Sequence, residues 1–181
     1  MNPRRQRLVE TYYNNKIPHI ELVVDNFENP HDISAIARSA DGLGIKKIHL
    51  YYTYIPCPDM QCVGKKSSAS ANKWIIYEQI DDLAQFYSEK RDYNFVAILQ
   101  QKKAISLHEY QFNNKTILVV PSPEKGLSPE LKCEHFVSLP LLRDALYSTS
   151  TATAVTLYEI FSQLGKHLTP LSSLIPRRKR D

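Results

Sequence analysis

The chain has 181 residues, of which 43% are hydrophobic and 23% are charged, and its formal net charge is +4. This length fits one domain with or without terminal extensions, and the composition excludes the disordered, collagen-like and coiled-coil classes. No apolar run approaches the roughly 20 residues of a membrane span, and the basic start lacks the apolar segment of a secretory signal, so we expect a cytoplasmic protein.

Strand-like and helix-like segments alternate along the chain. The first half of the chain is expected to form a basic helix over 4–14, a strand over 20–24, a helix over 30–43 and a strand over 47–52. A polar loop follows, in which a short strand near 74–77 is one alternative. The second half is expected to form a helix over 80–89, strands over 95–99 and 117–120, a short helix that begins at Ser128, a strand over 136–139 and a helix over 148–164. This alternation predicts an α/β fold with a mainly parallel sheet. The continuously apolar strands predict helices on both faces of that sheet. Residues 149–156 are rich in β-branched side chains, so a strand is the alternative there.

The positive charge gathers at the two ends of the chain. Residues 1–16 carry four cations and one carboxylate, and residues 166–181 carry five cations and one carboxylate. Two basic ends around a mildly acidic body are typical of a protein that binds phosphate groups. Charge alone supports equally the alternative that the ends only keep the protein soluble.

The cysteines do not indicate a disulfide framework or a metal site. Cys57, Cys62 and Cys133 are an odd number of thiols, which argues against a disulfide framework. Four residues separate Cys57 from Cys62, and no Cys or His pair follows at zinc-finger spacing. Buried, unreactive thiols are therefore predicted, and no metal is expected.

The helix over 30–43 begins with clear start signals. Asn29 is placed to cap it, Pro30 occupies the first helical position, and Gly44 can end it in left-handed backbone. The start of this helix follows a buried strand, so it lies at the carboxyl end of the sheet, where open α/β sheets bind ligands.

One face of the same helix is polar. His31, Ser34, Arg38 and Asp41 are spaced three, four and three residues apart, so they share a face away from the apolar stripe. A ligand-binding face is one interpretation, and a solvated face without a ligand is the other.

The stretch from Asp25 to Gly44 carries a specific resemblance. It reads Asp-Asn-x-x-Asn-Pro-His-Asp-Ile-Ser-Ala-Ile-Ala-Arg-Ser-Ala-Asp-Gly-Leu-Gly and resembles motif 1 of the SpoU/TrmH branch of the SPOUT methyltransferases. These enzymes use S-adenosyl-L-methionine (SAM) to methylate a ribose 2′-hydroxyl in tRNA or rRNA. The resemblance continues in the basic start, in residues 67–74 and at residues 157–159, so it covers nearly the whole chain.

The resemblance implies a fold and an assembly. It predicts a basic helical extension over 1–18, a SPOUT methyltransferase-like domain over 19–165 and a basic tail over 166–181. The domain is expected to have about six strands in a mainly parallel sheet, helices on both faces and a C-terminal trefoil knot. Enzymes of this branch are homodimers with the cofactor pocket near the subunit interface.

The resemblance also implies roles for individual residues. The catalytic arginine of the family falls on Arg38. Because an arginine stays protonated, its expected task is to hold a phosphate and stabilise the developing oxyanion. His31, on the same face, is the candidate acceptor of the hydroxyl proton, with local hydrogen bonding as the alternative. The residues expected to contact RNA are Arg38, Arg4, Arg5, Arg7, Arg177, Arg178, Lys179 and Arg180.

Motifs 2 and 3 of the family form the SAM pocket. Here the motifs fall on residues 121–128 and 139–159, and Pro121 and Pro123 stand where the family has glycine and glutamate. Leu146, Tyr147 and Ser148 stand where it has Ser-Leu-Asn, and Asp32 replaces the family's motif 1 asparagine. The residues expected to hold SAM are Ile98, Pro121, Gly126, Leu139, Tyr147 and Ser148.

These departures leave two hypotheses. The first is an RNA 2′-O-methyltransferase, favoured by Arg38 and Gly126. The second is an inactive SPOUT relative that has lost SAM and still binds RNA. Pro121 and Pro123 favour the second, because proline has no N–H to donate and cannot take a positive φ.

Overall fold

The computed structural model describes residues 17, 19–60, 71–142 and 146–165. In these residues the sheet has seven strands in the order β3-β2-β1-β6-β4-β7-β5, and every neighbouring pair is parallel. The strands are β1 (Ile20–Asp25), β2 (Lys47–Tyr51), β3 (Ile76–Gln79), β4 (Asn94–Ile98), β5 (Ile105–Ser106), β6 (Thr116–Val120) and β7 (His135–Ser138). The mainly parallel α/β fold is therefore confirmed.

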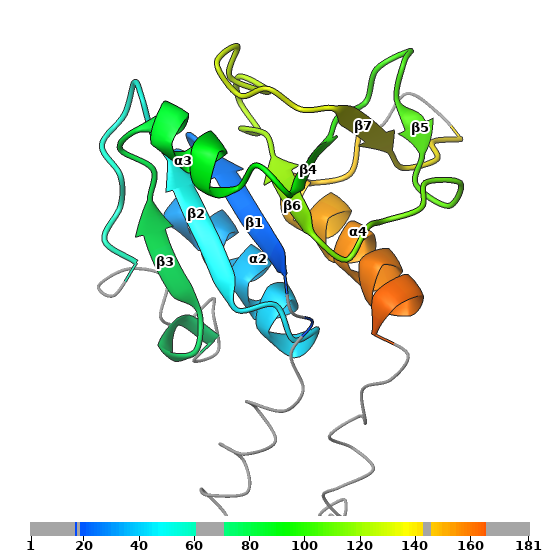
Figure 1. Ribbon diagram of the computed structural model, residues 1–181, viewed down its shortest axis with the longest axis horizontal. Helices are drawn as coiled ribbons and strands as arrows, with labels where there is room; N and C mark the ends of the chain where they lie inside the picture. The colour runs from blue at the N-terminus through cyan, green and yellow to red at the C-terminus, as the bar shows by residue number, and fades with distance from the viewer. Residues whose placement is uncertain (1–16, 18, 61–70, 143–145, 166–181) are drawn as a thin grey trace, which may run out of the picture.

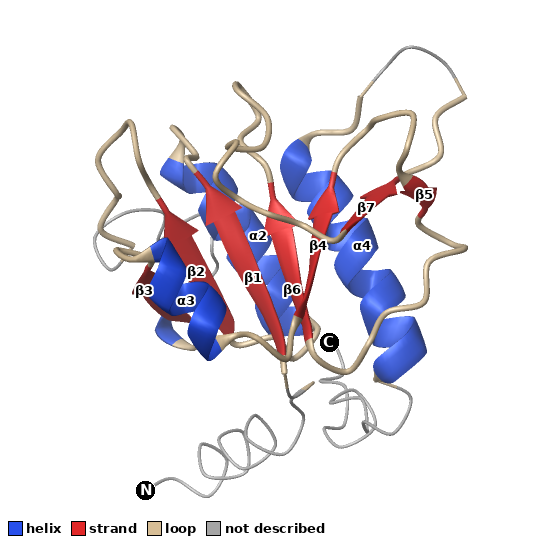
Figure 2. Ribbon diagram, turned by 45° about the horizontal axis from the view of Figure 1, so that its top comes forward, coloured by secondary structure: helices blue, strands red, loops and turns tan. Residues whose placement is uncertain are grey.

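Helices cover both faces of the sheet. Helices α2 (Pro30–Gly42) and α4 (Thr149–Leu164) lie side by side on one face, and α3 (Leu83–Glu89) lies on the other (Figures 1 and 2). A 3-10 turn, η1 (Ala71–Lys73), packs near α2. No helix in the described ranges is long and apolar enough to cross a membrane.

The centre of the sheet is buried because its strands are apolar on both faces. All six residues of β1 and all five of β6 are buried, and Leu22 of β1 pairs with Leu118 of β6. Alternate residues of β1 serve two cores. Leu22 packs toward α2 and α4, whereas Val23 packs with Phe86 of α3.

The three helices begin at polar caps. The Asn29 side chain accepts a hydrogen bond from the His31 N–H at 3.0 Å, which confirms the predicted start of α2. Asp82 caps α3, so this helix begins three residues later than predicted. Ser148 caps α4, where the helix rather than the strand alternative is confirmed. Gly44 has φ +82°, as predicted for a left-handed helix end.

Some local predictions were wrong. Ser34 was placed on the polar face of α2, but it is fully buried and its hydroxyl donates to the Pro30 carbonyl. Residues 128–131 form a turn rather than a short helix, because the Ser128 side chain bonds to Asp25 and Asn26 instead of capping. Strand β5 was not anticipated. The helix predicted over 4–14 lies outside the described residues.

An ion cluster lies beneath α3 at the amino end of β1. The Glu21 carboxylate lies 2.5 Å from His49 Nε2 and 2.6 Å from Lys90 Nζ. Burial disfavours ionisation, but hydrogen bonds and charges from His49 and Lys90 outweigh it and lower the pKa of Glu21 to about 2. The cluster therefore holds a carboxylate that stays ionised across the physiological range.

Candidate functional site

A cavity of about 240 Å³ opens at the carboxyl ends of β4, β6 and β7. The chain builds β1, β2 and β3 outward and then continues on the other side of β1, so the strand order reverses between β1 and β6, next to the cavity. Such a reversal is where open α/β folds bind ligands. The lining residues are Ile98, Leu99, Gln100, Pro121, Ser122, Pro123, Gly126, Leu139, Leu141, Leu146, Tyr147, Thr149 and Ala152.

Most of the residues predicted to hold the cofactor meet in this cavity. Ile98, Pro121, Gly126, Leu139 and Tyr147 all line it, although they come from four separate segments of the chain. Ser148 is not among the lining residues. Its hydroxyl instead accepts a hydrogen bond from the Thr151 N–H at the start of α4.

One wall of the cavity is the loop over residues 121–128. Within it, Ser122 and Gly126 exchange both backbone hydrogen bonds, at 3.1 and 2.9 Å, and Gly126 has φ +76°. Pro121 and Pro123 fit this hairpin because it does not need their missing N–H groups. The N–H groups of Ser122 and Gly126 are used inside the loop, and the Ser122 hydroxyl donates to the Glu124 carboxylate at 3.1 Å. The four residues therefore offer a ligand mainly carbonyl oxygens and apolar surface.

The remaining walls suit a flat, weakly polar group. Leu139, Leu141 and Leu146 supply apolar surface beside the Tyr147 ring, whose hydroxyl donates to the Pro140 carbonyl at 3.4 Å. The polar residues of the lining are Thr149, Ser122 and Gln100. A mainly apolar cavity with a few polar groups is the usual form of a cofactor site, so the residues present fit the adenosine part of SAM.

The sequence prediction missed several members of this site. Gln100 follows β4 and joins it to the end of β7 by donating to the Leu139 carbonyl at 3.2 Å. A polar residue just beyond a buried strand was a usable signal for Gln100. Thr149 and Ala152 carried no such signal, because their position depends on how α4 packs.

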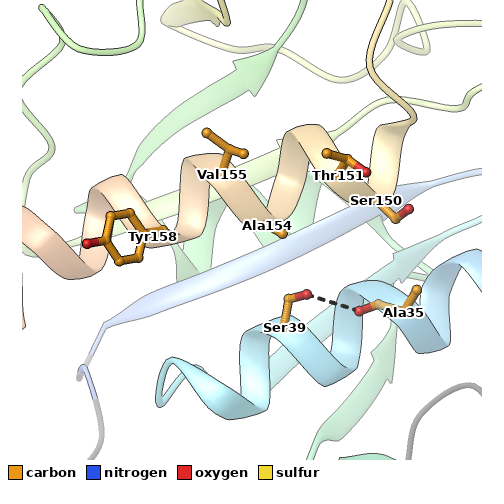
Figure 3. Close-up of a pocket in the computed structure, with 7 residues that line it drawn as sticks. All are labelled: Ala35, Ser39, Ser150, Thr151, Ala154, Val155 and Tyr158. Carbon is orange, nitrogen blue, oxygen red and sulfur yellow. Dashed lines mark hydrogen bonds between the residues drawn. The ribbon is translucent and has the colours of Figure 1, made fainter. Parts of the chain in front are cut away.

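Arg38 and His31 lie outside the cavity. Both side chains are exposed on α2, seven residues apart and therefore on one face. Between α2 and α4 runs an open groove, to which α2 contributes Ala35 and Ser39 (Figure 3). The first turn of α4 separates the groove from the cavity, since Ser150 and Thr151 line the groove while Thr149 and Ala152 line the cavity.

The groove has an apolar, exposed wall on α4. Val155 is 42% exposed and Tyr158 is 62% exposed, and Ala154 lines the same wall. Figure 3 shows these side chains on the same stretch of helix, above the Ser39 hydroxyl that donates to the Ala35 carbonyl at 3.3 Å. Apolar side chains that form a contiguous exposed surface, as these do along the groove, are typical of surfaces that contact other molecules.

The described cysteines, Cys57 and Cys133, are half-buried free thiols. Burial raises the pKa of the Cys133 thiol to about 12, and it also raises the pKa of the Cys57 thiol. A thiol in this state carries almost no thiolate at neutral pH. Within the described residues, no group of three or more His, Cys, Asp or Glu side chains is placed to hold a metal ion.

Comparison with known proteins defines the class. Residues 19–158 match the SpoU rRNA Methylase family. Because this match covers more than half of the chain, the protein belongs to that family. It is 29% identical over 146 residues to the tRNA (guanosine(18)-2'-O)-methyltransferase of Aquifex aeolicus, a match that covers 77% of this chain and 68% of that enzyme.

Solved structures share the fold. The crystal structure of the A. aeolicus TrmH/SpoU tRNA modifying enzyme matches with a TM-score of 0.78 at 23% identity, over 88% of this chain and 82% of that one. The SpoU methyltransferase AviRb from Streptomyces viridochromogenes, solved in complex with the cofactor AdoMet, matches with a TM-score of 0.69 at 20% identity. That match covers 79% of this chain and 59% of AviRb.

Proposed function

We propose that this protein transfers a methyl group from SAM to a ribose 2′-hydroxyl of tRNA or rRNA. The observation that carries the proposal is the cavity, which gathers five residues assigned to SAM from four separate segments. Family membership supports it, as do the names of relatives, which are tRNA (guanosine(18)-2'-O)-methyltransferases in Aquifex and Escherichia coli. The AviRb complex shows that a protein of this fold binds AdoMet.

The reaction assigns a task to two polar residues on α2. When bound, SAM supplies an electrophilic methyl group: the ribose oxygen bonds to its carbon as the carbon–sulfur bond breaks, and the hydroxyl proton leaves. Arg38 holds the phosphate next to the target ribose and stabilises charge on the attacking oxygen, because a guanidinium binds oxyanions in a fork. His31 receives the proton.

The inactive alternative is the weaker of the two hypotheses. It depended on Pro121 and Pro123 disrupting the pocket and on the replacement of Ser-Leu-Asn by residues 146–148. Of these last three residues, Leu146 and Tyr147 still line the cavity. Both prolines instead line an open cavity within a hairpin that keeps its own hydrogen bonds. Loss of two backbone donors therefore changes the contacts on one wall without closing the site.

The finer features of the family are part of the same proposal. A trefoil knot within residues 117–160 is supported by membership of the family and by its resemblance in motifs 2 and 3. A homodimer is supported by the exposed wall of the groove, and a second copy seated there would lie one helical turn from the cavity. A cytoplasmic location is expected for an enzyme that acts on tRNA or rRNA.

The basic ends are proposed to hold RNA. The N-terminal group is Arg4, Arg5 and Arg7 and the C-terminal group is Arg177, Arg178, Lys179 and Arg180; all lie outside the described residues. Their charge is the support, because cations clustered outside an acidic body attract the phosphate backbone. In this proposal residues 1–18 and 166–181 are RNA-binding extensions of the domain over 19–165.

The direct test is methyl transfer. The full-length chain is incubated with SAM carrying a tritiated methyl group and with tRNA or rRNA, and the RNA is digested to nucleosides. The expected product is a 2′-O-methylated nucleoside. Calorimetry with SAM alone separates the hypotheses: micromolar binding supports the enzyme, whereas silence at millimolar SAM leaves the inactive RNA-binding protein.

A further inference from the structure

Asp25 is a buried carboxylate that the proposed chemistry does not use. It is the last residue of β1 and has no exposed surface. Its oxygens accept three hydrogen bonds, from the Ser128 N–H at 2.6 Å, the Ser128 hydroxyl at 2.7 Å and the Asn26 side-chain amide at 2.9 Å. None of the ion pairs among the described residues involves Asp25, so hydrogen bonds alone compensate its burial.

The neighbouring Asn26 extends these contacts to a second loop. Asn26 has φ +49°, an uncommon conformation for a residue with a side chain. Its side-chain oxygen accepts from the Thr53 N–H at 2.9 Å, and its amide donates to the Ser128 hydroxyl at 3.2 Å. Its backbone N–H donates to the Tyr51 carbonyl at 2.8 Å. Asp25 and Asn26 therefore join the ends of β1 and β2 to the chain that follows β6.

The segment held in this way is the 121–128 loop of the cavity. Pro121 continues directly from β6, which fixes one end of the loop. Ser128 is its other end, and Asp25 holds both the backbone N–H and the hydroxyl of that residue. Between these anchors, Ser122, Pro123 and Gly126 line the cavity together with Pro121.

We infer that Asp25 is a positioning residue for the cofactor: it holds the 121–128 loop in the conformation that forms one wall of the SAM cavity. This inference rests on the proposed function. Asp25 does not line the cavity, so it acts through Ser128 and the loop. A short charge-assisted hydrogen bond to a backbone N–H is well suited to this role, because it fixes the main chain itself.

The test uses Asp25→Asn, which keeps the size of the side chain. In one orientation, the new side-chain NH2 group faces the Ser128 N–H; in the other, it faces the Asn26 side-chain amide. In both cases two hydrogen-bond donors oppose each other. Glu21→Gln is the matched control, since Glu21 is a buried carboxylate on the same strand that contacts His49, Lys90 and Tyr93 rather than the loop. Ser128→Ala is a milder variant that keeps the backbone N–H and is expected to fold if Asp25→Asn does not.

Three measurements are made on the full chain. Hydrogen exchange without ligand is expected to speed up in peptides covering 121–128 in Asp25→Asn and not in Glu21→Gln. Calorimetry is expected to show SAM binding weakened roughly tenfold or more in Asp25→Asn and less in Ser128→Ala. Steady-state methyl transfer by Asp25→Asn is expected to show KM for SAM raised more than kcat is lowered. Glu21→Gln is expected to bind SAM as the natural chain does.

Each outcome decides something. Unchanged exchange over 121–128 in Asp25→Asn overturns the claim that Asp25 holds the loop. Faster exchange with unchanged SAM affinity overturns its role in cofactor binding, and so does an equal loss of affinity in Glu21→Gln. If the natural chain does not bind SAM, the proposed function fails, while the exchange data still decide whether Asp25 holds the loop.

Discussion

The two polar groups assigned to chemistry on α2 differ in kind from the residues that line the cavity. Arg38 and His31 are exposed and reach outward from a helix whose other face is fully buried. The cavity residues are mostly apolar and come from loops at the strand ends. This division predicts that substrate chemistry and cofactor binding can be separated by single substitutions.

Arg38→Ala provides that separation. Methyl transfer is expected to fall by about 100-fold or more, the range for losing one oxyanion donor, while SAM affinity changes little because Arg38 is outside the cavity. Single-turnover transfer and calorimetry measure the two effects. Arg38→Lys keeps the charge but not the fork and is expected to recover only part of the rate. Equal loss of rate and SAM affinity would give Arg38 a structural role instead.

Glu21 predicts a pH dependence of stability. Its pKa is lowered from 4.5 to about 2 in the folded protein. A carboxylate with a lowered pKa stabilises the fold above its unfolded pKa, and this contribution is lost as the pH falls from about 4.5 toward 2. The loss is on the order of 2–3 kcal/mol. Urea unfolding at stepped pH should show this component in the natural chain and not in Glu21→Gln, whereas the exposed Glu89→Gln should keep it.

At the scale of elements, α2 depends on its first turn. Asn29→Ala removes the side chain that caps the His31 N–H and is expected to lower the free energy of unfolding by about 1 kcal/mol. Asn29→Asp retains an acceptor at the same place and is expected to cost much less. Chemical denaturation of both variants measures the difference, and equal losses would show that the cap does not stabilise α2.

The sequence predicted those elements whose signals are local. Strands such as β1 and β6 are continuously apolar, and α2 has a cap, an N1 proline and a terminal glycine. Strand β5 has only two residues, and so short a segment shows no alternation of apolar and polar residues. The turn at Ser128 was misassigned because its capping side chain is engaged by Asp25, a residue about 100 positions away in the chain. Long-range contacts of this kind leave no local pattern.

The candidate site also contains residues that the sequence predicted and residues that it did not. The residues of the 121–128 loop and Leu139 were assigned through resemblance to family motifs, and their meeting in one cavity needed the fold. Leu141 and Ala152 were missed, since an apolar residue beside a cofactor has the same sequence signature as one in a core. The polar residue Gln100 was the one missed member with a positional signal.

At the scale of the molecule, the groove between α2 and α4 predicts the oligomeric state. A homodimer is expected in sedimentation at micromolar concentration, because Val155 and Tyr158 leave neighbouring apolar surface exposed along one wall of the groove, which a second copy would cover. Tyr158→Arg should shift the protein to monomer. Ile76→Arg changes an equally exposed apolar residue on the edge strand β3 and should leave the dimer intact. A natural chain that sediments as a monomer would contradict the proposal.

The basic tail predicts a salt dependence of RNA binding. Each phosphate neutralised contributes roughly −0.7 to −0.9 to the slope of log affinity against log salt. Replacing Arg177, Arg178, Lys179 and Arg180 by glutamine keeps the length of the tail. This variant is expected to weaken binding of all tRNA sequences alike and to flatten the slope by about two or more. If the slope of log affinity against log salt does not change, the tail does not bind RNA phosphates and serves only to keep the protein soluble.

The position of β6 in the sheet has a consequence for biosynthesis. Leu22 of β1 pairs with Leu118 of β6, so the two central strands are separated by about 96 residues of chain. While the ribosome is still making the intervening segment, the nascent chain can pair β1 with β2 but must leave the other edge of β1 open. Pairings this distant in sequence form slowly, and an open apolar edge is prone to aggregate. Expression at lower temperature or with chaperones should therefore raise the soluble yield.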